Sequence, residues 1–445
     1  MSDYMFMLEN HLTAEQARAL AEVAAAAAQA SVNLFLTGGA VRDMIGGSPI
    51  RDLDFTIEGN AIKIAKTVAP KAHAEILSID EHRKRVAMRF PGGVTAEIAM
   101  ARQERYNKPG AKPQVTPATI HEDLRGRDFT INSLALSLNK ASRGLLLDPN
   151  NGLSDLEHKE LRTVGNYTLY DEPIRIFRLY RFKVRFGFQI AERTLSQCAN
   201  AREAEVEKHI APRSFYEELC HIADEPNPGE VLQVLEQEKL LPLVAPFLAG
   251  PKLNLPGFAK LQKAKQLMPF GFGVDLNIDN TAIFFWLLTE KMTPKERAAF
   301  VKAIAMERSE VSPWQTLEAK AKKLEKELKS ARLQKPSQVY AAMVKGPGEQ
   351  LLYLLVKSAE RLVLDRIRNY YQKYLPAAQE ITDREVAASG LTPGTPKFNK
   401  AKEQMIATRL DSRPKKVAPV PAEVPAAPTP GRGPAPGPIV GRKHA

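Results

Sequence analysis

Cysteine and long apolar runs are scarce in this sequence. Its 445 residues include only Cys198 and Cys220, with no CxxC pair, which excludes a disulfide framework and a cysteine-based zinc site. The longest strongly apolar run, Ile283–Leu288, is too short to cross a bilayer, and Met1–Asn10 lacks the basic segment of a secretion signal. We therefore expect a soluble, cytoplasmic protein that makes no membrane contact.

Negative charge is under-represented, since the formal net charge is +12. Such an excess predicts a polyanionic partner, and nucleic acid is favoured over anionic lipid. Part of the excess lies in residues 413–445, where nine prolines and six Lys or Arg accompany a single Glu. A segment of that composition cannot bury enough apolar surface to fold, so we expect it to be disordered.

The remaining chain divides into a mixed part and a helical part. Thr13–Ala30 predicts a helix capped by Thr13 and Gln16, and a second helix is expected at 61–69. Short strands are predicted at 34–37, 53–57, 75–79, 85–90 and 94–99. Beyond Asp171 nearly every segment has helical periodicity, including 173–186 and 349–374. The fold class is therefore α+β.

A pair of glycines follows the first predicted strand, in Gly38-Gly39-Ala-Val-Arg42-Asp. Glycine-freed backbone amides at the start of a helical turn could face a triphosphate, while Arg42 neutralises its charge. Taken alone, the pair favours an ordinary turn.

Two aspartates alternate with apolar residues on the next predicted strand, in Asp52-Leu-Asp54-Phe. Alternate residues of a strand share a face, so the two carboxylates converge while Leu53 and Phe55 enter the core. Carboxylate oxygens suit Mg²⁺, and such a site fits two-metal activation of a 3′-hydroxyl that attacks an α-phosphate. Glu97, on a neighbouring predicted strand, is the candidate for a third carboxylate.

Arg127 and Asp128 precede an apolar segment that we expect to be a helix. The pair is interpreted either as part of a nucleotide site or as a helix start with a salt bridge, and both can hold together.

Four ordered motifs resemble a known family. Gly38-Gly39-x-Val-Arg-Asp, Asp52-Leu-Asp54, Arg127-Asp-Phe-Thr-Ile-Asn and Asp171-Glu-Pro-Ile-Arg175, with Arg178 and Arg181 beyond, resemble the class II tRNA nucleotidyltransferases and bacterial poly(A) polymerases. The likeness continues weakly through Pro212–Leu219 to Gly390–Gly394 and Leu410–Asp411, so it covers about residues 15–412.

The resemblance implies a division into domains. A nucleotidyltransferase head of the polymerase-beta type with a mixed sheet (1–139) would precede an all-α neck that selects the nucleotide (140–212), an all-α body (213–330) and an all-α tail that binds tRNA (331–412). The Pro-rich basic segment 413–445 lies outside the resemblance.

The resemblance also implies residue roles. Asp52 and Asp54 would hold the metal ions, with Glu97 completing the catalytic carboxylates. The nucleotide would be bound by residues from the head and from the neck helix, namely Gly38, Gly39, Arg42, Arg127, Asp128, Glu172, Arg175, Arg178 and Arg181. Arg181 lies about half a turn from Glu172 around the helix, so phosphate binding and a structural role both stay open for it.

Base selection has a chemical logic of its own. A carboxylate accepts from an exocyclic amino group while an arginine donates to the adjacent ring nitrogen, which fits cytosine and adenine. Uracil and guanine present a carbonyl and a ring N–H, so both contacts would be unpaired. Glu172 and Arg175 are three residues apart and therefore adjacent on a helix.

The sequence departs from the family pattern at two places that bear on nucleotide preference. Asp171-Glu172 stands where Glu-Asp is usual, so the base-reading carboxylate is one methylene longer or the register differs. Gly126 stands where an arginine is usual, which removes one positive charge. The Pro- and Gly-containing segment 105–117 is either a family-type loop that helps to switch between CTP and ATP or a plain surface connection.

The activity expected from the resemblance is template-independent, Mg²⁺-dependent addition of C, C and A from CTP and ATP to the tRNA 3′ end, with contacts to the acceptor and T-arm. CC-only and A-only addition and poly(A) synthesis remain alternatives. Gly126 also keeps open a non-catalytic RNA-binding relative. The sequence leaves the oligomeric state unknown.

Overall fold

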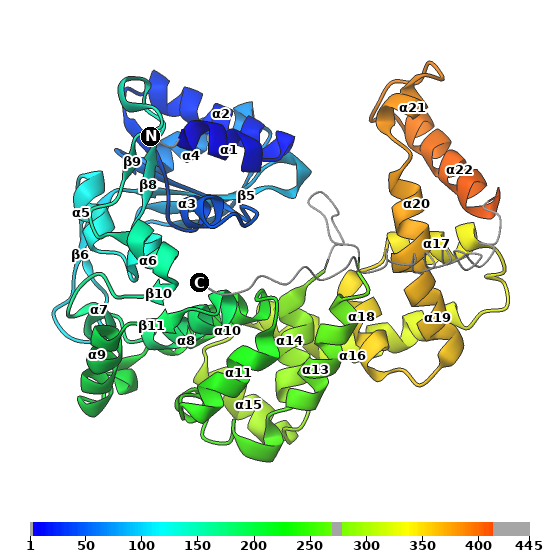
Figure 1. Cartoon of the computed structure of the whole chain (residues 1–445). Helices are drawn as coiled ribbons and strands as arrows, with labels where there is room; N and C mark the ends of the chain where they lie inside the picture. Colours follow the sequence, from blue (N-terminus) through cyan, green and yellow to red (C-terminus); the bar gives the residue numbers. More distant parts are fainter. Residues whose placement is uncertain (1–2, 269–277, 413–445) are drawn as a thin grey trace, which may run out of the picture.

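The computed structural model describes residues 3–268 and 278–412. A mixed sheet with its covering helices forms the first part of the chain, and helices form nearly all the rest (Figure 1). The predicted α+β class is confirmed. The segment 413–445, for which disorder is predicted, lies outside the described residues.

The head is built on a seven-stranded sheet of order β3-β4-β5-β2-β1-β8-β9. β2 and β5 run parallel, whereas the other neighbours are antiparallel. Its strands are β1 (Asn33–Thr37), β2 (Leu53–Glu58), β3 (Glu75–Asp80), β4 (Arg85–Arg89), β5 (Thr95–Met100), β8 (Ala135–Ser137) and β9 (Leu146–Leu147). Two small pairs, β6 (Arg102–Arg105) with β7 (Gln114–Pro117) and β10 (Glu160–Leu161) with β11 (Gln189–Ile190), lie outside it.

Helices α1, α2 and α4 contribute to the apolar core of the head. The predicted cap is confirmed, because the Thr13 side chain and Gln16 form a capping box at the start of α2. The helices of this part are α1 (Tyr4–His11), α2 (Ala14–Gln29), α3 (Gly38–Ile45), α4 (Ala61–Lys71), α5 (Ile120–Arg125) and α6 (Gly152–His158).

The prediction of a helix after Asp128 is wrong. A single 3₁₀ turn, Thr130–Asn132, leads into strand β8, which pairs with β1 inside the sheet. All three residues of β8 are buried. A strand buried on both faces has a continuous apolar pattern that periodicity cannot distinguish from a buried helix.

The helical part begins with α7, which ends at Asp171, and among the described residues it is interrupted by one strand, β11. Its helices are α7 (Thr168–Asp171), α8 (Arg175–Phe186), α9 (Glu192–Glu203), α10 (Pro212–Ala223), α11 (Pro228–Gln237), α12 (Leu241–Val244), α13 (Leu255–Lys265), α14 (Asn280–Thr289), α15 (Pro294–Ala303), α16 (Arg308–Leu328), α17 (Pro336–Val344), α18 (Gly348–Lys357), α19 (Arg361–Asn369), α20 (Leu375–Gln379), α21 (Asp383–Ala387) and α22 (Pro396–Ser412). None of the helices in the described ranges has the length and apolarity that crossing a bilayer requires.

The periodic segment 349–374 forms α18, α19 and a π-helical turn, Tyr370–Tyr374, instead of one continuous α-helix. The break falls at Ser358, whose backbone is extended and whose hydroxyl accepts a hydrogen bond from the Glu360 N–H at 3.1 Å. Such local side-chain bonding competes with the helical ladder.

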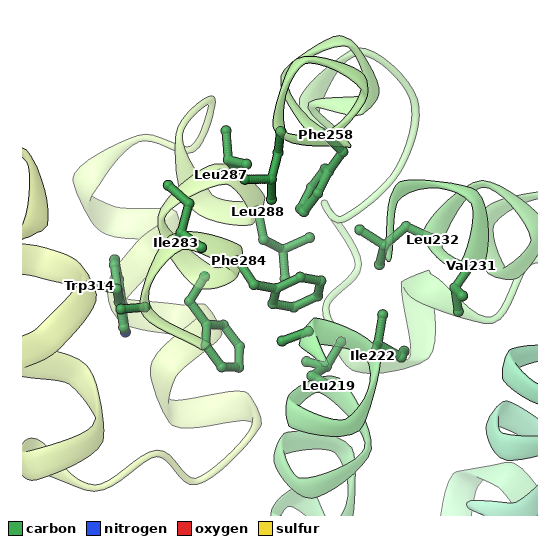
Figure 2. Packing of buried hydrophobic residues seen from close by; sticks show 14 of the residues in the cluster. Leu219, Ile222, Val231, Leu232, Phe258, Ile283, Phe284, Leu287, Leu288 and Trp314 are labelled. Carbon is green, nitrogen blue, oxygen red and sulfur yellow. The ribbon is translucent and has the colours of Figure 1, made fainter. Parts of the chain in front are cut away.

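One long core of buried side chains runs from Phe129, near the end of the predicted head, through the neck and body to Leu375 within the predicted tail. Figure 2 shows Leu219, Leu232, Phe258 and Phe284, from four different helices, pointing toward one another. A smaller cluster, Ala377 to Leu410, joins the last helices. The head and these last helices stand at opposite ends of the helical body (Figure 1). The domain boundaries at 139, 212, 330 and 412 stay predictions.

Candidate active site

A cavity of about 460 Å³ lies between the head sheet and the neck helix α8. Its volume is in the range of sites for small molecules. Every residue predicted for the site from the sequence lines this cavity, namely Gly38, Gly39, Arg42, Asp52, Asp54, Glu97, Arg127, Asp128, Glu172, Arg175, Arg178 and Arg181.

The carboxylates on the head come together through the parallel pairing of β2 and β5. In that register Asp54 lies directly beside Glu97, and Asp52 just precedes β2, where it accepts a hydrogen bond from the Thr95 hydroxyl. Burial, followed by repulsion from Glu97 and then Asp52, raises the pKa of Asp54 to about 7. The two nearby cations, Arg127 and Arg42, oppose this rise in pKa without cancelling it.

Oxygen donors in such a cluster suit a hard divalent cation. Among the described residues, however, no group of three or more Asp, Glu, His or Cys side chains forms a complete ligand set. One oxygen of Glu97 already pairs with Arg85 (Nη1–Oε2 3.3 Å). The residues thus fit a metal held by Asp52 and Asp54 and completed by substrate oxygens and water, which is how Mg²⁺ is commonly bound.

The two glycines leave open space in front of Asp54. Gly38 has φ +60°, a left-handed conformation that favours glycine. A Cβ atom added to Gly39 would lie 3.4 Å from both Asp54 Oδ2 and Arg42 Nη2. The absence of side chains here keeps the space between a carboxylate and a guanidinium free for a ligand.

Arg42 is anchored more firmly than the sequence indicates. It is buried, its Nε donates to Asp43 Oδ1 at 2.8 Å, and its Nη1 donates to Asn132 Oδ1. Its guanidinium also lies 4.6 Å from the centre of the Phe186 ring. These contacts fix the cation at one end of the cavity, next to the glycine turn.

Arg127 lies near Gly38, where an added Cβ atom would be 3.9 Å from its Nη1, and it is half-buried. Its Nη2 donates to Asp123 Oδ2 at 2.7 Å and to Thr56 Oγ1 at 3.1 Å. Burial opposes its charge, but the neighbouring Asp123 raises the pKa of Arg127 above its usual value. This arginine therefore stays cationic beside Asp54.

Asp128 is a buried anchor for the neck. Its Oδ2 accepts from Arg178 Nη1 at 2.9 Å, and its Oδ1 accepts from the backbone N–H of Phe129 at 2.7 Å and from Asn132 Nδ2 at 3.0 Å. Burial would raise its pKa, yet Arg178 and Arg175 hold it well below the usual range. These contacts are those of a positioning carboxylate that fixes Arg178 at the cavity wall.

Glu172 and Arg175 form the opposite wall. The carboxylate lies 2.8 Å from the Arg175 guanidinium (Oε2–Nε) and 3.1 Å from Arg83 (Oε1–Nη2). Burial favours the neutral form, but Arg175, Arg178 and Arg83 together lower the pKa of Glu172. Glu172 is thus an ionised acceptor that lines the same cavity as the glycines.

Arg181 is turned into the protein. It is only 5% exposed, and it pairs with Glu218 at 2.6 Å and with Glu225 at 2.8 Å. Of the two interpretations left open by its place on the helix, these contacts favour the structural one.

Several lining residues escaped the sequence analysis. Asn132 bonds both Arg42 and Asp128, and its place four residues after Asp128 was a usable signal. Arg185 reaches Asp43 (Nη2–Oδ2 3.2 Å) across 142 residues, and Arg83 reaches Glu172 across 89. No local sequence pattern predicts these two ion pairs, because their partners lie far apart in the sequence.

The segment 105–117 is part of a hairpin. β6 pairs with β7, and the intervening loop contacts the neck through the Gly110 N–H, which donates to Asp171 O at 3.0 Å. The loop therefore touches the residue next to Glu172.

Comparisons with known proteins agree with this geometry. Residues 34–162 match the model of the Poly A polymerase head domain. The chain is 25% identical to the A-adding tRNA nucleotidyltransferase of Geobacter sulfurreducens over 92% of its own length and 47% of the relative's. It is 35% identical to the CC-adding tRNA nucleotidyltransferase of Deinococcus radiodurans over 46% of its length and 53% of the relative's. The chain thus spans about half of each of these two relatives.

Solved structures agree in fold. A CCA-adding enzyme in its apo form II superposes with a TM-score of 0.54 at 22% identity, covering 93% of this chain and 96% of that one. The Thermotoga maritima CCA-adding enzyme complexed with tRNA gives 0.51 at 21% identity, covering 94% and 96%. The predicted resemblance is therefore confirmed for the head by the family model, and the solved structures share the fold of nearly the whole chain.

Proposed function

We propose that this chain is a Mg²⁺-dependent tRNA nucleotidyltransferase that adds C, C and A from CTP and ATP to the tRNA 3′ end. The observation that carries the proposal is the pairing of Asp54 with Glu97, beside Asp52, on the floor of a cavity whose opposite wall is Glu172 and Arg175. Metal-seeking carboxylates thus lie across one small space from a pair suited to reading a base. The names of the relatives support the same chemistry.

In this proposal Asp52 and Asp54 hold Mg²⁺, which would activate the 3′-hydroxyl and stabilise charge on the α-phosphate. Glu97 adds negative charge next to Asp54. The open backbone at Gly38 and Gly39 receives the phosphates between two fixed cations, Arg42 and Arg127. Fixed charges of this kind stabilise developing charge without reorganising during the reaction.

Base selection follows from the opposite wall. Glu172 accepts from the exocyclic amino group of cytosine or adenine, and Arg175 donates to the ring nitrogen beside it. Arg178, which pairs with Asp128, extends this wall. Arg181 stabilises helix α8 through its buried ion pair with Glu218. The predicted tail would hold the tRNA mainly through phosphates and shape.

A-only addition is the second candidate. It is favoured because the Geobacter relative, which aligns with 92% of this chain, is an A-adding enzyme. The same residues on this chain would then serve ATP alone.

Extension of three tRNAs, ending before CC, after the first C and after CC, separates these activities. Each is incubated with Mg²⁺ and CTP, ATP or both, and the products are resolved to one nucleotide. Complete CCA on the shortest tRNA supports the proposal, and extension of only the CC-ended tRNA by one A identifies the A-adding enzyme. Stopping at CC identifies a CC-adding enzyme, and an indefinite A ladder on unrelated RNA identifies a poly(A) polymerase. No extension by a folded, nucleotide-binding protein identifies a non-catalytic relative.

A further inference from the structure

Arg83 belongs to none of the motifs, yet it contacts the base-reading wall. It lies in the turn between β3 and β4, about a quarter exposed. Its Nη2 donates to Glu172 Oε1 at 3.1 Å, and its Nε lies 3.4 Å from Glu104 Oε1 on the β6–β7 hairpin. One guanidinium of the head therefore joins carboxylates from the hairpin and from the neck.

The turn that carries Arg83 is braced at both ends. Asp80 Oδ1 accepts from the backbone N–H groups of His82 (3.0 Å) and Arg83 (2.9 Å), and Asp80 Oδ2 pairs with Arg85 at 3.3 Å. His82 Nε2 lies 2.8 Å from the carbonyl oxygen of Pro113 on the hairpin. Arg83 is thus presented from a fixed backbone, as positioning of another side chain requires.

Glu104, the second partner of Arg83, is itself fixed by neighbouring side chains. It pairs with Arg102 at 2.7 Å and accepts from the Tyr106 hydroxyl at 2.7 Å. Burial opposes ionisation, but Arg83 and Arg102 lower the pKa of Glu104 to about 2. Both carboxylates that Arg83 contacts are therefore anions.

The consequence for Glu172 is geometric. Arg83 engages Oε1 and Arg175 engages Oε2, so two cations from different parts of the chain fix the plane of one carboxylate. An ionised carboxylate only accepts hydrogen bonds, whereas a protonated one could present a donor to a carbonyl. Arg83 and Glu172 also both line a neighbouring cavity of about 860 Å³. Their ion pair lies where the two cavities meet.

We propose that Arg83 is a specificity-determining positioning residue, which holds Glu172 so that bases with an amino group, cytosine and adenine, are accepted and uracil and guanine are rejected. This inference rests on the proposed function and deepens it. It assigns part of the nucleotide choice to a residue of the head that lies outside the neck helix.

The test compares Arg83→Ala with Arg83→Lys and with the matched control Arg89→Ala. Arg89 is an exposed arginine of β4 whose partner is Glu75, 3.6 Å away.

We measure kcat and KM for CTP, ATP, UTP and GTP in single-nucleotide tRNA extension, and the dissociation constants of the four nucleotides without tRNA. For Arg83→Ala we expect KM for CTP and ATP to rise and discrimination against UTP and GTP to fall about tenfold, as loss of a charge-assisted contact implies. Lysine restores part of the discrimination because it keeps the charge without the planar fork. Arg89→Ala matches the unsubstituted protein.

A second variant, Glu104→Gln, keeps the inference testable if Arg83→Ala does not fold. It loosens Arg83 without touching Glu172, and we expect a smaller loss of discrimination in the same direction. Unchanged discrimination in both variants, in turnover and in binding, overturns the inference. If the unsubstituted protein extends no tRNA but binds CTP or ATP selectively, the proposed function fails while the binding ratio still decides the role of Arg83. If it binds no nucleotide selectively, both fail.

Discussion

Two groups of carboxylates at the cavity differ in how their charge is compensated. One is the floor, formed by Asp52, Asp54 and Glu97 on the head sheet, and the other surrounds Glu172 and Arg175, the wall formed by the neck. On the floor, Asp54 lies beside two other carboxylates, and its pKa is raised to about 7. Around the neck helix α8, Asp128, Glu172 and Glu218 are also enclosed, yet their pKa values are lowered because each faces arginines. Like charges left without compensation indicate a place for a cation, whereas alternating charges indicate a preorganised scaffold.

The alternating charges run beyond the wall itself. Arg178 links Asp128 to Glu218, Arg181 links Glu218 to Glu225, and Arg185 continues toward Asp43 in the head. Helix α8 therefore ties the head to α10 through ion pairs buried between them. The scaffold fixes the distance between the metal-seeking floor and the base-reading wall.

The largest expected effect comes from breaking the floor. Asp54→Asn should lower the rate of tRNA extension by about 10²-fold or more, because it removes a proposed metal ligand. The matched control Glu75→Gln changes an exposed carboxylate of β3, 66% exposed, and should leave the rate unchanged. Single-turnover extension measures both. An Asp54→Asn variant with normal turnover would refute the assignment of the floor.

Breaking the scaffold should instead reduce stability. Glu218→Ala leaves the buried Arg181 with one partner fewer and should lower the free energy of unfolding by about 3–5 kcal/mol. Its neighbour Glu217 is exposed and lies 3.8 Å from Arg213, so Glu217→Ala should change stability by less than about 1 kcal/mol. Urea denaturation distinguishes the two. Equal values for both variants would show that the buried network does not stabilise the fold.

A smaller effect should appear in the pH dependence of stability. Because the folded-state pKa of Asp54 is raised from 3.8 to about 7, its contribution to stability is fully present below pH 3.8 and is lost as the pH rises through 7. Without divalent cation, Asp54→Asn should therefore melt at a higher temperature than the unsubstituted protein at pH 8, and this advantage should shrink toward pH 4. Thermal melts across this range provide the measurement. A constant difference at all pH values would mean that Asp54 is not strained by its neighbours.

The sequence predicted the floor better than the scaffold, for a physical reason. Asp52 and Asp54 are two apart on a strand, so period two puts them together. The pairing of Glu97 with Asp54 needed the parallel register of two strands, which the sequence only suggested. The links from Arg83 to Glu172 and from Asp43 to Arg185 join residues 89 and 142 positions apart, and no local periodicity encodes them. The strand that replaced the expected helix after Asp128 follows from burial on both faces.

Binding of Mn²⁺, a paramagnetic substitute for Mg²⁺, tests the central claim most directly. Electron paramagnetic resonance at pH 8 counts the bound ion in the presence of a non-hydrolysable CTP or ATP analogue. The account predicts that the unsubstituted protein binds Mn²⁺ with the nucleotide, that Asp52→Asn and Asp54→Asn lose most of this binding, and that Glu75→Gln retains it. Undiminished Mn²⁺ binding in both aspartate variants would contradict the account.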